Sequence, residues 1–403
     1  MKNNDIKLLY VASGKYFFSN NLPRKIAGVI NSFKGVGAEV RVLSGGDLVN
    51  TSISMQSINT KYHETIKSSP LISFFRHSFS ELLDIIHDWS LQKKTEQIIS
   101  EFNPSIIWER SSRLHSSSLR LAKKHGIPYV LEWKDNILSL YGNSFFKIYA
   151  KYIEKRKITE ANYIVVESTH LANTLAMEWK INRNRFLVAI NGVDTDEFST
   201  NDEMKQTERK TIGIKKSNWV VVYVGSFTWY HNVNFLIEAA KIIFNEKQIK
   251  DVIFLMVGDG LKQMECIELV KKYQIEDNFR FIGKKNQVDI PHILQACDVA
   301  VLPDCLEIIC PIKVQEYMSV GLPVLVPDYQ ANKEVVTDMQ DGVLFKPKEP
   351  SDIAKKLTAL YIDQVNAKKI GANARITALG KFTWEKTWGK TLLDILDDQY
   401  DKK

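Results

Sequence analysis

The sequence contains few cysteines and no cluster of metal-binding side chains around them. Four cysteines occur in 403 residues, all in the second half, without paired short spacing or a neighbouring group of histidines. This excludes a disulfide scaffold and argues against a zinc site. We therefore expect reduced, partly buried thiols at four positions: Cys266, Cys297, Cys305 and Cys310.

Long apolar runs are also missing. No stretch approaches the length needed to span a bilayer, and the apolar run in MKNNDIKLLYVASG is too short for a secretory signal. With thiols expected to be reduced, these features predict a cytoplasmic protein that is soluble or peripheral on the inner face of the membrane.

Excess positive charge is confined to one half of the chain. Residues 1–200 hold 26 Lys and Arg against 19 Asp and Glu, whereas residues 201–403 hold 28 of each. A basic face can meet nucleic acid, anionic lipid or a phosphorylated substrate, or simply be a soluble surface. Nucleic acid is the least favoured of these partners, because no nucleic-acid motif is present and most basic positions lack neighbouring aromatics.

Apolar segments of strand length alternate with helical stretches in both halves, which is typical of parallel βαβ sheets. The strands expected in the first half are KLLYVAS, EVRVLS, SIIWER, PYVLEW, YIVVES and FLVAI. Those expected in the second half are WVVVYVGS, VIFLMVGDG, FRFIG, VAVLP, LPVLVP and GVLFKP. The pattern predicts two Rossmann-like doubly wound domains whose sheet ends face a shared cleft.

The domain limits follow from the segments between these strands. STNDEMKQTERKTIGIKKS (residues 199–217) is polar and charged, so we interpret it as an interdomain connection with the boundary near residue 205. The division is then an acceptor-binding domain over 1–205, a nucleotide-sugar-binding domain over 206–381, and a helix over 382–403 that packs towards the first domain.

Two segments of the first half are candidates for contact with an anionic membrane. Residues 68–94 favour a long surface helix with a core face, because the polar face of this segment is not clearly basic. FFKIYAKYIEKRKI, from Phe145, places aromatics beside lysines and an arginine. For this second segment an interfacial and a merely solvated face are equally supported.

A glycine turn follows the first strand of the second half, at Gly225, and such turns let backbone N–H groups approach a phosphate. The order of motifs around it resembles glycosyltransferase family 4, retaining enzymes of the GT-B fold. The motifs are NGVDTDEF (191–198), LIEA (236–239), MVGDG (256–260), FIG (281–283), ACDVAVLP (296–303) and EYMSVGLPVLV (316–326).

The resemblance implies a nucleotide-sugar donor, with its diphosphate bound in the loop after Gly225. Family members carry an Arg directly after this glycine and a Lys five residues later, and those positions are Ser226 and His231 here. A protonated His231 could meet the phosphate, or His231 only fills space in the loop. Ser226 cannot replace a permanently charged arginine.

The second departure concerns an acidic pair. Glu316 matches the family Glu that accepts hydrogen bonds from the ribose hydroxyls, whereas the other Glu is displaced by one residue to Glu307. CPIKVQEYM resembles a subset with a Pro-x-Lys element, which implies that the N–H groups from Ile312 onward and the Lys313 ammonium face the diphosphate. A surface ion pair between Lys313 and Glu316 is the alternative.

Lys313, His231 and Glu307 are thus the candidate catalytic residues, and the base would meet backbone at Ile282, Gly283 and Lys284. The resemblance implies front-face displacement of the diphosphate without a metal ion or other cofactor. We interpret Asp194-Thr195-Asp196 as turn and cap chemistry rather than a metal site.

In the first domain, the glycine loop at Gly14 and Lys15 corresponds to one that approaches the donor phosphate and the acceptor, or is a turn only. Glu132, Lys134 and Asp135 are candidate acceptor-site residues.

The leading hypothesis is transfer of a sugar from a UDP- or GDP-sugar to a glycan or glycolipid acceptor in surface polysaccharide biosynthesis. A catalytically weak partner subunit that binds sugar nucleotides remains an alternative, because the Arg is missing and one Glu is displaced. A sugar-nucleotide epimerase of the same fold would need paired acids and bases that the sequence does not offer.

Overall fold

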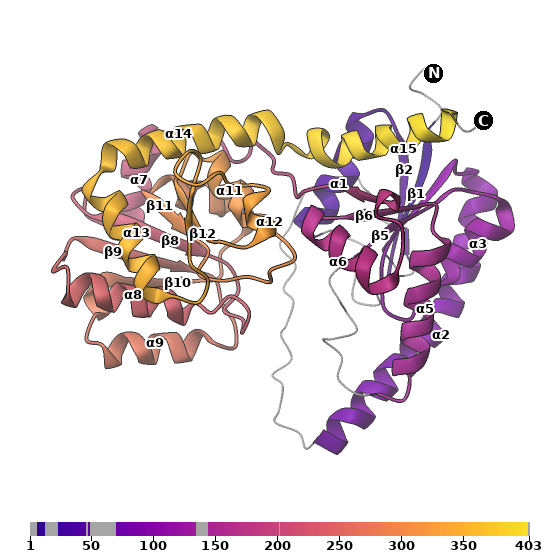
Figure 1. The fold of residues 1–403 in the computed structure, drawn as a ribbon, viewed down its shortest axis with the longest axis horizontal. Helices are drawn as coiled ribbons and strands as arrows, with labels where there is room; N and C mark the ends of the chain where they lie inside the picture. Colours follow the sequence, from indigo (N-terminus) through magenta and orange to yellow (C-terminus); the bar gives the residue numbers. More distant parts are fainter. Residues whose placement is uncertain are drawn as a thin grey trace. The chain divides into compact units, whose positions relative to one another are not determined.

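The computed structural model describes residues 6–12, 23–45, 47–48, 70–133, 144–200 and 202–401. The chain forms two compact units, one comprising Met1–Ala189 with Trp388–Lys403 and the other Ile190–Thr387 (Figure 1). Two α/β units were predicted correctly. The expected boundaries near 205 and 381 were wrong, since the second unit begins earlier and ends later.

The first unit is built on a seven-stranded sheet in the order β3-β2-β1-β4-β5-β6-β7. All neighbouring strands run parallel except β2 and β3. The strands are β1 (Lys7–Ala12), β2 (Glu39–Ser44), β3 (Asp47–Leu48), β4 (Ile106–Arg110), β5 (Tyr129–Glu132), β6 (Tyr163–Val166) and β7 (Phe186–Val188). Only the two-residue β3 was not expected from the sequence.

Helices connect the parallel strands of this first unit. They are α1 (Arg24–Gly35), α2 (Pro70–Phe102), α3 (Ser117–His125), α5 (Lys147–Glu160) and α6 (Thr169–Trp179). The long surface helix expected over residues 68–94 is confirmed from Pro70, and it continues to Phe102. Across the part of the chain that the structure describes, none of the helices has the length and apolar character required to cross a membrane.

The last helix, α15 (Lys390–Asp401), completes the first unit (Figure 1). Trp388, just before it, is fully buried and packs on Trp108 of β4, with ring centroids 6.2 Å apart. The hydroxyl of Tyr163 on β6 donates to Asp398 at 2.6 Å. The segment from Trp388 onward therefore belongs to the first unit, whereas residues 382–387 of the predicted C-terminal helix belong to the second.

The second unit has a six-stranded sheet in the order β10-β9-β8-β11-β12-β13, and all its strand pairs are parallel. Its strands are β8 (Trp219–Val224), β9 (Val252–Val257), β10 (Phe279–Gly283), β11 (Val299–Val301), β12 (Val324–Pro327) and β13 (Val343–Phe345). Each corresponds to an expected strand. Runs such as VIFLMV are buried throughout because helices cover both faces of the sheet.

The helices of the second unit include α7 (Asp202–Ile212), α8 (Asn234–Asn245), α9 (Gln263–Lys272), α10 (Ile290–Gln295), α11 (Lys313–Ser319), α12 (Gln330–Lys333), α13 (Pro350–Ile362) and α14 (Gln364–Lys381). Helix α7 corrects our interpretation of residues 199–217 as a connection. Arg209 of α7 is buried and donates to the carbonyl of Ala296 and to Asp298. Its aliphatic stem and these bonds fix a polar segment to the unit.

Candidate functional site

The strand order of the second unit reverses between β8 and β11. Strand β9 pairs with one side of β8, and β11 pairs with the other side of β8. In open α/β sheets, ligands bind at the carboxyl ends of the strands where the order reverses. The loops that follow β8 and β11, and helix α11 after them, are therefore the expected walls of a binding site.

Gly225 begins the loop after β8, and Lys313 reaches it from the first residue of α11. A Cβ atom placed on Gly225 would lie 2.2 Å from Nζ of Lys313, so only glycine leaves room for the ammonium. A Cβ on Gly258 would lie 2.0 Å from the Gly225 carbonyl oxygen. Tyr317 of α11 donates its hydroxyl to the carbonyl of Val224 and accepts from its N–H, at 3.1 and 2.8 Å. These contacts hold α11 against the glycine turn.

The Lys313 ammonium is held by two aromatic side chains. Its Nζ lies 3.2 Å from Nε2 of His231 and 4.9 Å from the ring centroid of Tyr223. Burial lowers the pKa of Lys313 to about 8, against the opposing effect of Glu316, which raises it. The lysine thus remains mostly charged at neutral pH, in a partly desolvated position that strengthens its attraction to an anion.

His231 is buried, and both of its ring nitrogens have partners. Nδ1 lies 3.1 Å from the carbonyl oxygen of Asp304, which can only accept, so Nδ1 carries the hydrogen and Nε2 accepts from Lys313. Burial and the Lys313 charge lower the pKa of His231 to about 3. In this arrangement the imidazole is neutral and orients the lysine, and contact between a protonated His231 and a phosphate stays a prediction.

Asp304, which sequence reasoning did not select, ties the two loops together. Its carboxylate accepts from Asn232 at 2.8 Å, from the hydroxyl of Tyr329 at 3.0 Å and from the N–H of Cys305 at 2.9 Å. The only sequence signal is its position directly after ACDVAVLP, at the end of a buried strand. This buried carboxylate fixes the loop that carries His231.

The structure brings together Gly225, Ser226, His231, Lys313 and Glu316. Glu316 is buried on α11, one turn after Lys313, and the carbonyl of Ser226 accepts from the hydroxyl of Tyr223. Ile312 is the residue that precedes the first residue of α11.

The other predicted donor-site residues lie in the loop after β11 and at the end of β10. Glu307 is exposed in the loop after β11, and its catalytic role stays a prediction. Ile282 and Gly283 end β10, where the Gly283 carbonyl accepts from the N–H of Gly258, and Lys284 is exposed beyond it. The proposed backbone contact to a base at these three residues stays a prediction.

Glu132 is the one predicted acceptor residue whose surroundings are described. Its carboxylate forms a buried ion pair with Arg110 and accepts from the hydroxyl of Tyr10 at 2.8 Å and from Nε1 of Trp108 at 3.1 Å. These partners do not support direct contact with an acceptor. The remaining first-unit candidates lie outside the described residues: Gly14, Lys15, Lys134 and Asp135.

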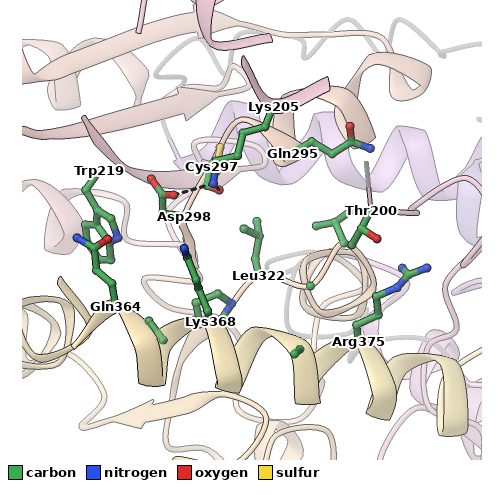
Figure 2. A pocket seen from close by; sticks show the side chains of 15 residues that line it. Thr200, Lys205, Trp219, Gln295, Cys297, Asp298, Leu322, Gln364, Lys368 and Arg375 are labelled. Atoms are coloured by element: carbon green, nitrogen blue, oxygen red, sulfur yellow. Dashed lines mark hydrogen bonds and ion pairs between the residues drawn. The ribbon is translucent and has the colours of Figure 1, made fainter. Parts of the chain in front are cut away.

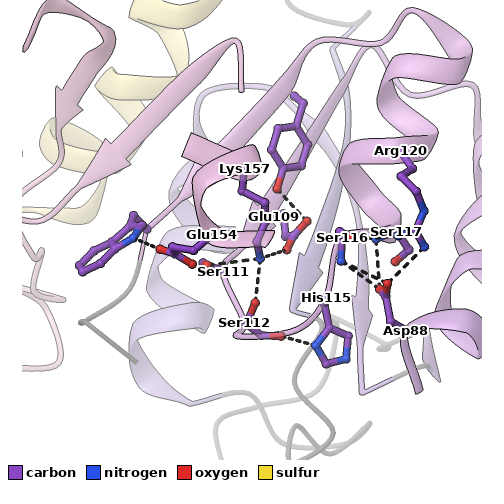
Figure 3. A network of polar contacts seen from close by, with 12 residues as sticks. Asp88, Glu109, Ser111, Ser112, His115, Ser116, Ser117, Arg120, Glu154 and Lys157 are labelled. Carbon is purple, nitrogen blue, oxygen red and sulfur yellow. Dashed lines mark hydrogen bonds and ion pairs between the residues drawn. The ribbon is translucent and has the colours of Figure 1, made fainter. Parts of the chain in front are cut away.

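A second buried network follows the carboxyl end of β4 (Figure 3). Lys157 of α5 is fully buried and donates to Glu109 at 3.0 Å and to the carbonyl of Ser112 at 2.7 Å. The carboxylate of Asp88 accepts from the N–H groups of Ser116 and Ser117. The contacts anchor α2, α3 and α5 around the loop after β4, where the strand order of this sheet reverses.

Asp194-Thr195-Asp196 has the turn role that its sequence predicted. The Asp194 carboxylate accepts from the N–H groups of Asp196 at 3.1 Å and Glu197 at 3.0 Å. This is the local hydrogen bonding of an Asp that begins a turn.

A cavity of about 480 Å³ lies at the opposite end of the strands of the second sheet (Figure 2). Trp219 begins β8, and Asp298 and Pro323 directly precede β11 and β12, so the cavity lies at the amino ends of these strands. Lys205 bonds to Asp298 at 2.8 Å along its wall. The cavity is therefore distinct from the residues around Lys313.

Sequence comparison identifies two family profiles that together cover most of the chain. The profile described as "Glycosyl transferases group 1" matches residues 204–377, and "Glycosyltransferase Family 4" matches residues 49–197.

Among similar proteins, UDP-Gal:alpha-D-GlcNAc-diphosphoundecaprenol alpha-1,3-galactosyltransferase of Escherichia coli is 32% identical over 180 residues, which are 43% of this chain and 45% of the relative. The D-inositol 3-phosphate glycosyltransferase of Geodermatophilus obscurus is 27% identical over 58% of this chain and 52% of the relative. The chain thus spans about half the length of these two relatives. A Campylobacter jejuni N,N'-diacetylbacillosaminyl-diphospho-undecaprenol alpha-1,3-N-acetylgalactosaminyltransferase is 22% identical over 70% of this chain and 74% of the relative.

Solved structures share the fold over nearly the whole chain. HepE of Anabaena in complex with UDP has a TM-score of 0.71 and 17% identity, and the match covers 98% of this chain and 100% of that one. Sucrose-phosphate synthase of Thermosynechococcus elongatus has a TM-score of 0.71 and 15% identity, with 99% and 100% covered. The predicted GT-B fold of two Rossmann-like units is confirmed.

Proposed function

The chain belongs to the group 1 glycosyltransferases of family 4, and from this membership we propose that it moves a sugar from a UDP- or GDP-sugar to a glycan or lipid-linked acceptor. The anomeric configuration is retained and no metal ion is required. One observation carries the proposal: the Lys313 ammonium lies over Gly225, at the strand ends where the sheet order reverses. A cation above a glycine turn suits a diphosphate.

The reaction places its largest change of charge on the diphosphate. As the bond from the anomeric carbon to the phosphate oxygen breaks, negative charge grows on that oxygen, and Lys313 stabilises it. His231 orients the ammonium through Nε2, since the lysine donates to it at 3.2 Å. Glu316 accepts from the ribose hydroxyls, as a carboxylate can accept from both members of a diol.

Retention follows from front-face displacement in this proposal. The acceptor hydroxyl attacks from the side that the diphosphate leaves, and its proton passes to the leaving phosphate oxygen. The bond to the sugar therefore forms and breaks on one face, and no covalent sugar intermediate on the protein is needed.

The acceptor class rests on the similar proteins. Two of them carry names that specify diphosphoundecaprenol-linked sugars, and a structural neighbour binds UDP. We infer for this chain a lipid-linked or glycan acceptor in surface polysaccharide biosynthesis, in the cytoplasm at the inner face of the membrane.

One observation favours a second candidate, a partner subunit that binds a sugar nucleotide without turning it over. Ser226 provides no charge, His231 is neutral and Glu307 is exposed, so Lys313, whose pKa burial lowers to about 8, is the cation that the structure places against Gly225.

A panel of nucleotide sugars tests both candidates. Stabilisation by a UDP- or GDP-sugar, together with donor hydrolysis or transfer, is expected for the enzyme. Stabilisation by UDP or GDP without turnover of any donor would establish the partner subunit instead. If no nucleotide raised the melting temperature, the donor site itself would be misassigned.

A further inference from the structure

The first half of α2 exposes a stripe of large apolar side chains. Exposed residues recur three and four positions apart along one side of the helix: Ile72, Phe75, Phe79, Leu82, Ile86 and Trp89. Phe79 and Trp89 are 63% and 69% exposed. Because a helix rises about 1.5 Å per residue, the stripe extends over roughly 25 Å. Soluble proteins rarely leave a contiguous apolar surface of this size without a partner.

Helix α5 adds a second exposed apolar group that adjoins the stripe. Phe145, just before α5, has its ring 5.9 Å from Phe75 and 4.6 Å from Phe74, and its N–H donates to Ser78 of α2. From there the exposed aromatic and aliphatic residues continue along α5 as Ile148, Tyr149 and Tyr152. We call these exposed residues of α2 and α5 together the apolar face.

Lysines flank the apolar face on α5. Lys147, Lys151 and Lys155 are exposed at intervals of one helical turn, beside Tyr149 and Tyr152. The acidic residues of α5 do not contribute to this face. Glu154 is buried, and its carboxylate accepts from Trp133. Glu160 pairs with Arg156 and Lys123.

Helix α2 likewise exposes basic residues and buries acidic ones. Its exposed charged residues between positions 71 and 94 are basic, namely Arg76, Lys93 and Lys94, whereas Asp84 is half-buried. Glu81 and Asp88 are buried, where Glu81 pairs with Arg113 at 2.7 Å and Asp88 caps α3. The exposed surface therefore combines aromatic and aliphatic groups with basic side chains.

We propose that the apolar face of α2 and α5 docks on an anionic lipid bilayer. Aromatic and aliphatic side chains enter the boundary between headgroups and acyl chains, while the lysines of α5 contact lipid phosphates. A second copy of this chain is the less suitable occupant, because pairing two identical faces would bring their lysines together. This inference rests on the proposed function for its setting, since a lipid-linked acceptor is presented at such a surface.

Vesicle sedimentation with the full chain tests the proposal without any turnover. Wild-type protein is expected to bind vesicles of phosphatidylcholine mixed with phosphatidylglycerol, and to bind phosphatidylcholine alone more weakly. Phe79→Ser with Trp89→Ser is expected to abolish binding. Lys151→Gln with Lys155→Gln is expected to weaken binding to the mixed vesicles by roughly 25-fold, since each lysine near an anionic surface contributes about 1 kcal/mol.

Matched controls lie on the second unit. Val365→Ser with Ile376→Ser removes two equally exposed apolar groups from α14, and Lys271→Gln with Lys272→Gln removes two exposed lysines from α9. Both should bind vesicles like wild type. Unchanged melting temperatures establish that all four variants are folded.

Absence of wild-type binding to mixed vesicles would overturn the proposal. So would a wild-type dimer that Phe79→Ser with Trp89→Ser converts to a monomer, since the partner would then be a second copy. Donor hydrolysis is measured separately in solution. Failure of vesicle binding with hydrolysis intact rejects the docking surface alone, whereas failure of hydrolysis with binding intact rejects the proposed transfer alone.

Discussion

At the scale of single residues, Lys313 is the side chain on which the proposed donor site depends most. Its ammonium is half-buried above Gly225, and its neighbour His231 is neutral. We expect Lys313→Ala to weaken binding of UDP or GDP by about 10-fold to 100-fold, because a charge-assisted hydrogen bond contributes about 1.5–3 kcal/mol. The measurement is the nucleotide-dependent rise in melting temperature, titrated with ligand.

Lys271→Ala is the control for this change, since Lys271 is an exposed lysine of α9 in the same unit. It should retain the full nucleotide response. An unaltered response in Lys313→Ala would remove the residue from the donor site.

His231 is expected to make the stability of the protein depend on pH. The direction of this dependence follows from the lowered pKa of the buried imidazole. Burial and Lys313 lower its pKa to about 3 in the folded protein, against an ordinary value of about 6.5 in the unfolded chain. Below pH 6.5 the unfolded chain binds a proton that the native protein refuses, so stability is lost as the pH falls. Relative to His231→Gln, which cannot titrate, the wild type should lose about 2 kcal/mol between pH 7 and pH 5.

Urea unfolding at the two pH values measures this difference. His292→Gln is the control, because His292 is exposed and its replacement should leave the pH dependence of the wild type unchanged. Parallel losses in wild type and His231→Gln would show that the imidazole is protonated in the native state.

At the scale of elements, replacing two glycines of neighbouring loops by alanine should have different effects, one mainly on nucleotide binding and the other mainly on stability. A Cβ on Gly225 meets the end of a flexible side chain, Nζ of Lys313, whereas a Cβ on Gly258 meets the backbone oxygen of Gly225. We expect Gly225→Ala to lose most of the nucleotide response with a smaller loss of stability. Gly258→Ala should destabilise the protein more strongly, because backbone cannot move aside as a side chain can.

Gly380→Ala in α14 is the matched control, since a Cβ there meets nothing within 4 Å. It should preserve both the nucleotide response and the stability. Equal melting temperatures for Gly225→Ala and Gly258→Ala would contradict the close approach of the two loops.

The strands were predictable from sequence because parallel strands covered by helices on both faces are continuous apolar runs. Twelve runs were expected, and each contains an observed strand. Only β3 was missed, since two residues carry no pattern. Helix α7 was missed because Arg209 is buried through hydrogen bonds to residues about 90 positions away, which no local composition reveals.

The residues of the candidate site could be selected from the sequence, but the charges of these residues could not. The spacing of motifs selected Gly225, His231 and Lys313, and the structure places them together. The neutral state of His231 depends on Lys313, 82 positions along the chain, and on the Asp304 carbonyl. The burial of Glu132 likewise depends on partners from other strands. Such protonation and burial arise only from tertiary packing.

At the scale of the whole molecule, each unit has its own sheet and its own buried residues, so each can melt as a cooperative structure. Gly225, His231 and Lys313 of the proposed donor site belong to the unit Ile190–Thr387, while α15 and Trp388 belong to the other. Calorimetry is therefore expected to show two transitions that respond to different changes. UDP at about 100 times its dissociation constant should stabilise one of them by roughly 2.7 kcal/mol and leave the other unchanged.

Trp388→Ala should act on the transition that UDP leaves unchanged. The indole is fully buried between Trp108 and the Lys25 ammonium, which lies 5.1 Å from its ring centroid. Removing a buried tryptophan costs about 3–5 kcal/mol through lost contacts and the cavity that remains. Leu393→Ala on α15 is the control, because this leucine is partly exposed and its loss should cost far less. If Trp388→Ala and UDP moved the same transition in opposite directions, the two units would not unfold independently and the assignment of α15 to the first core would lose its thermodynamic support.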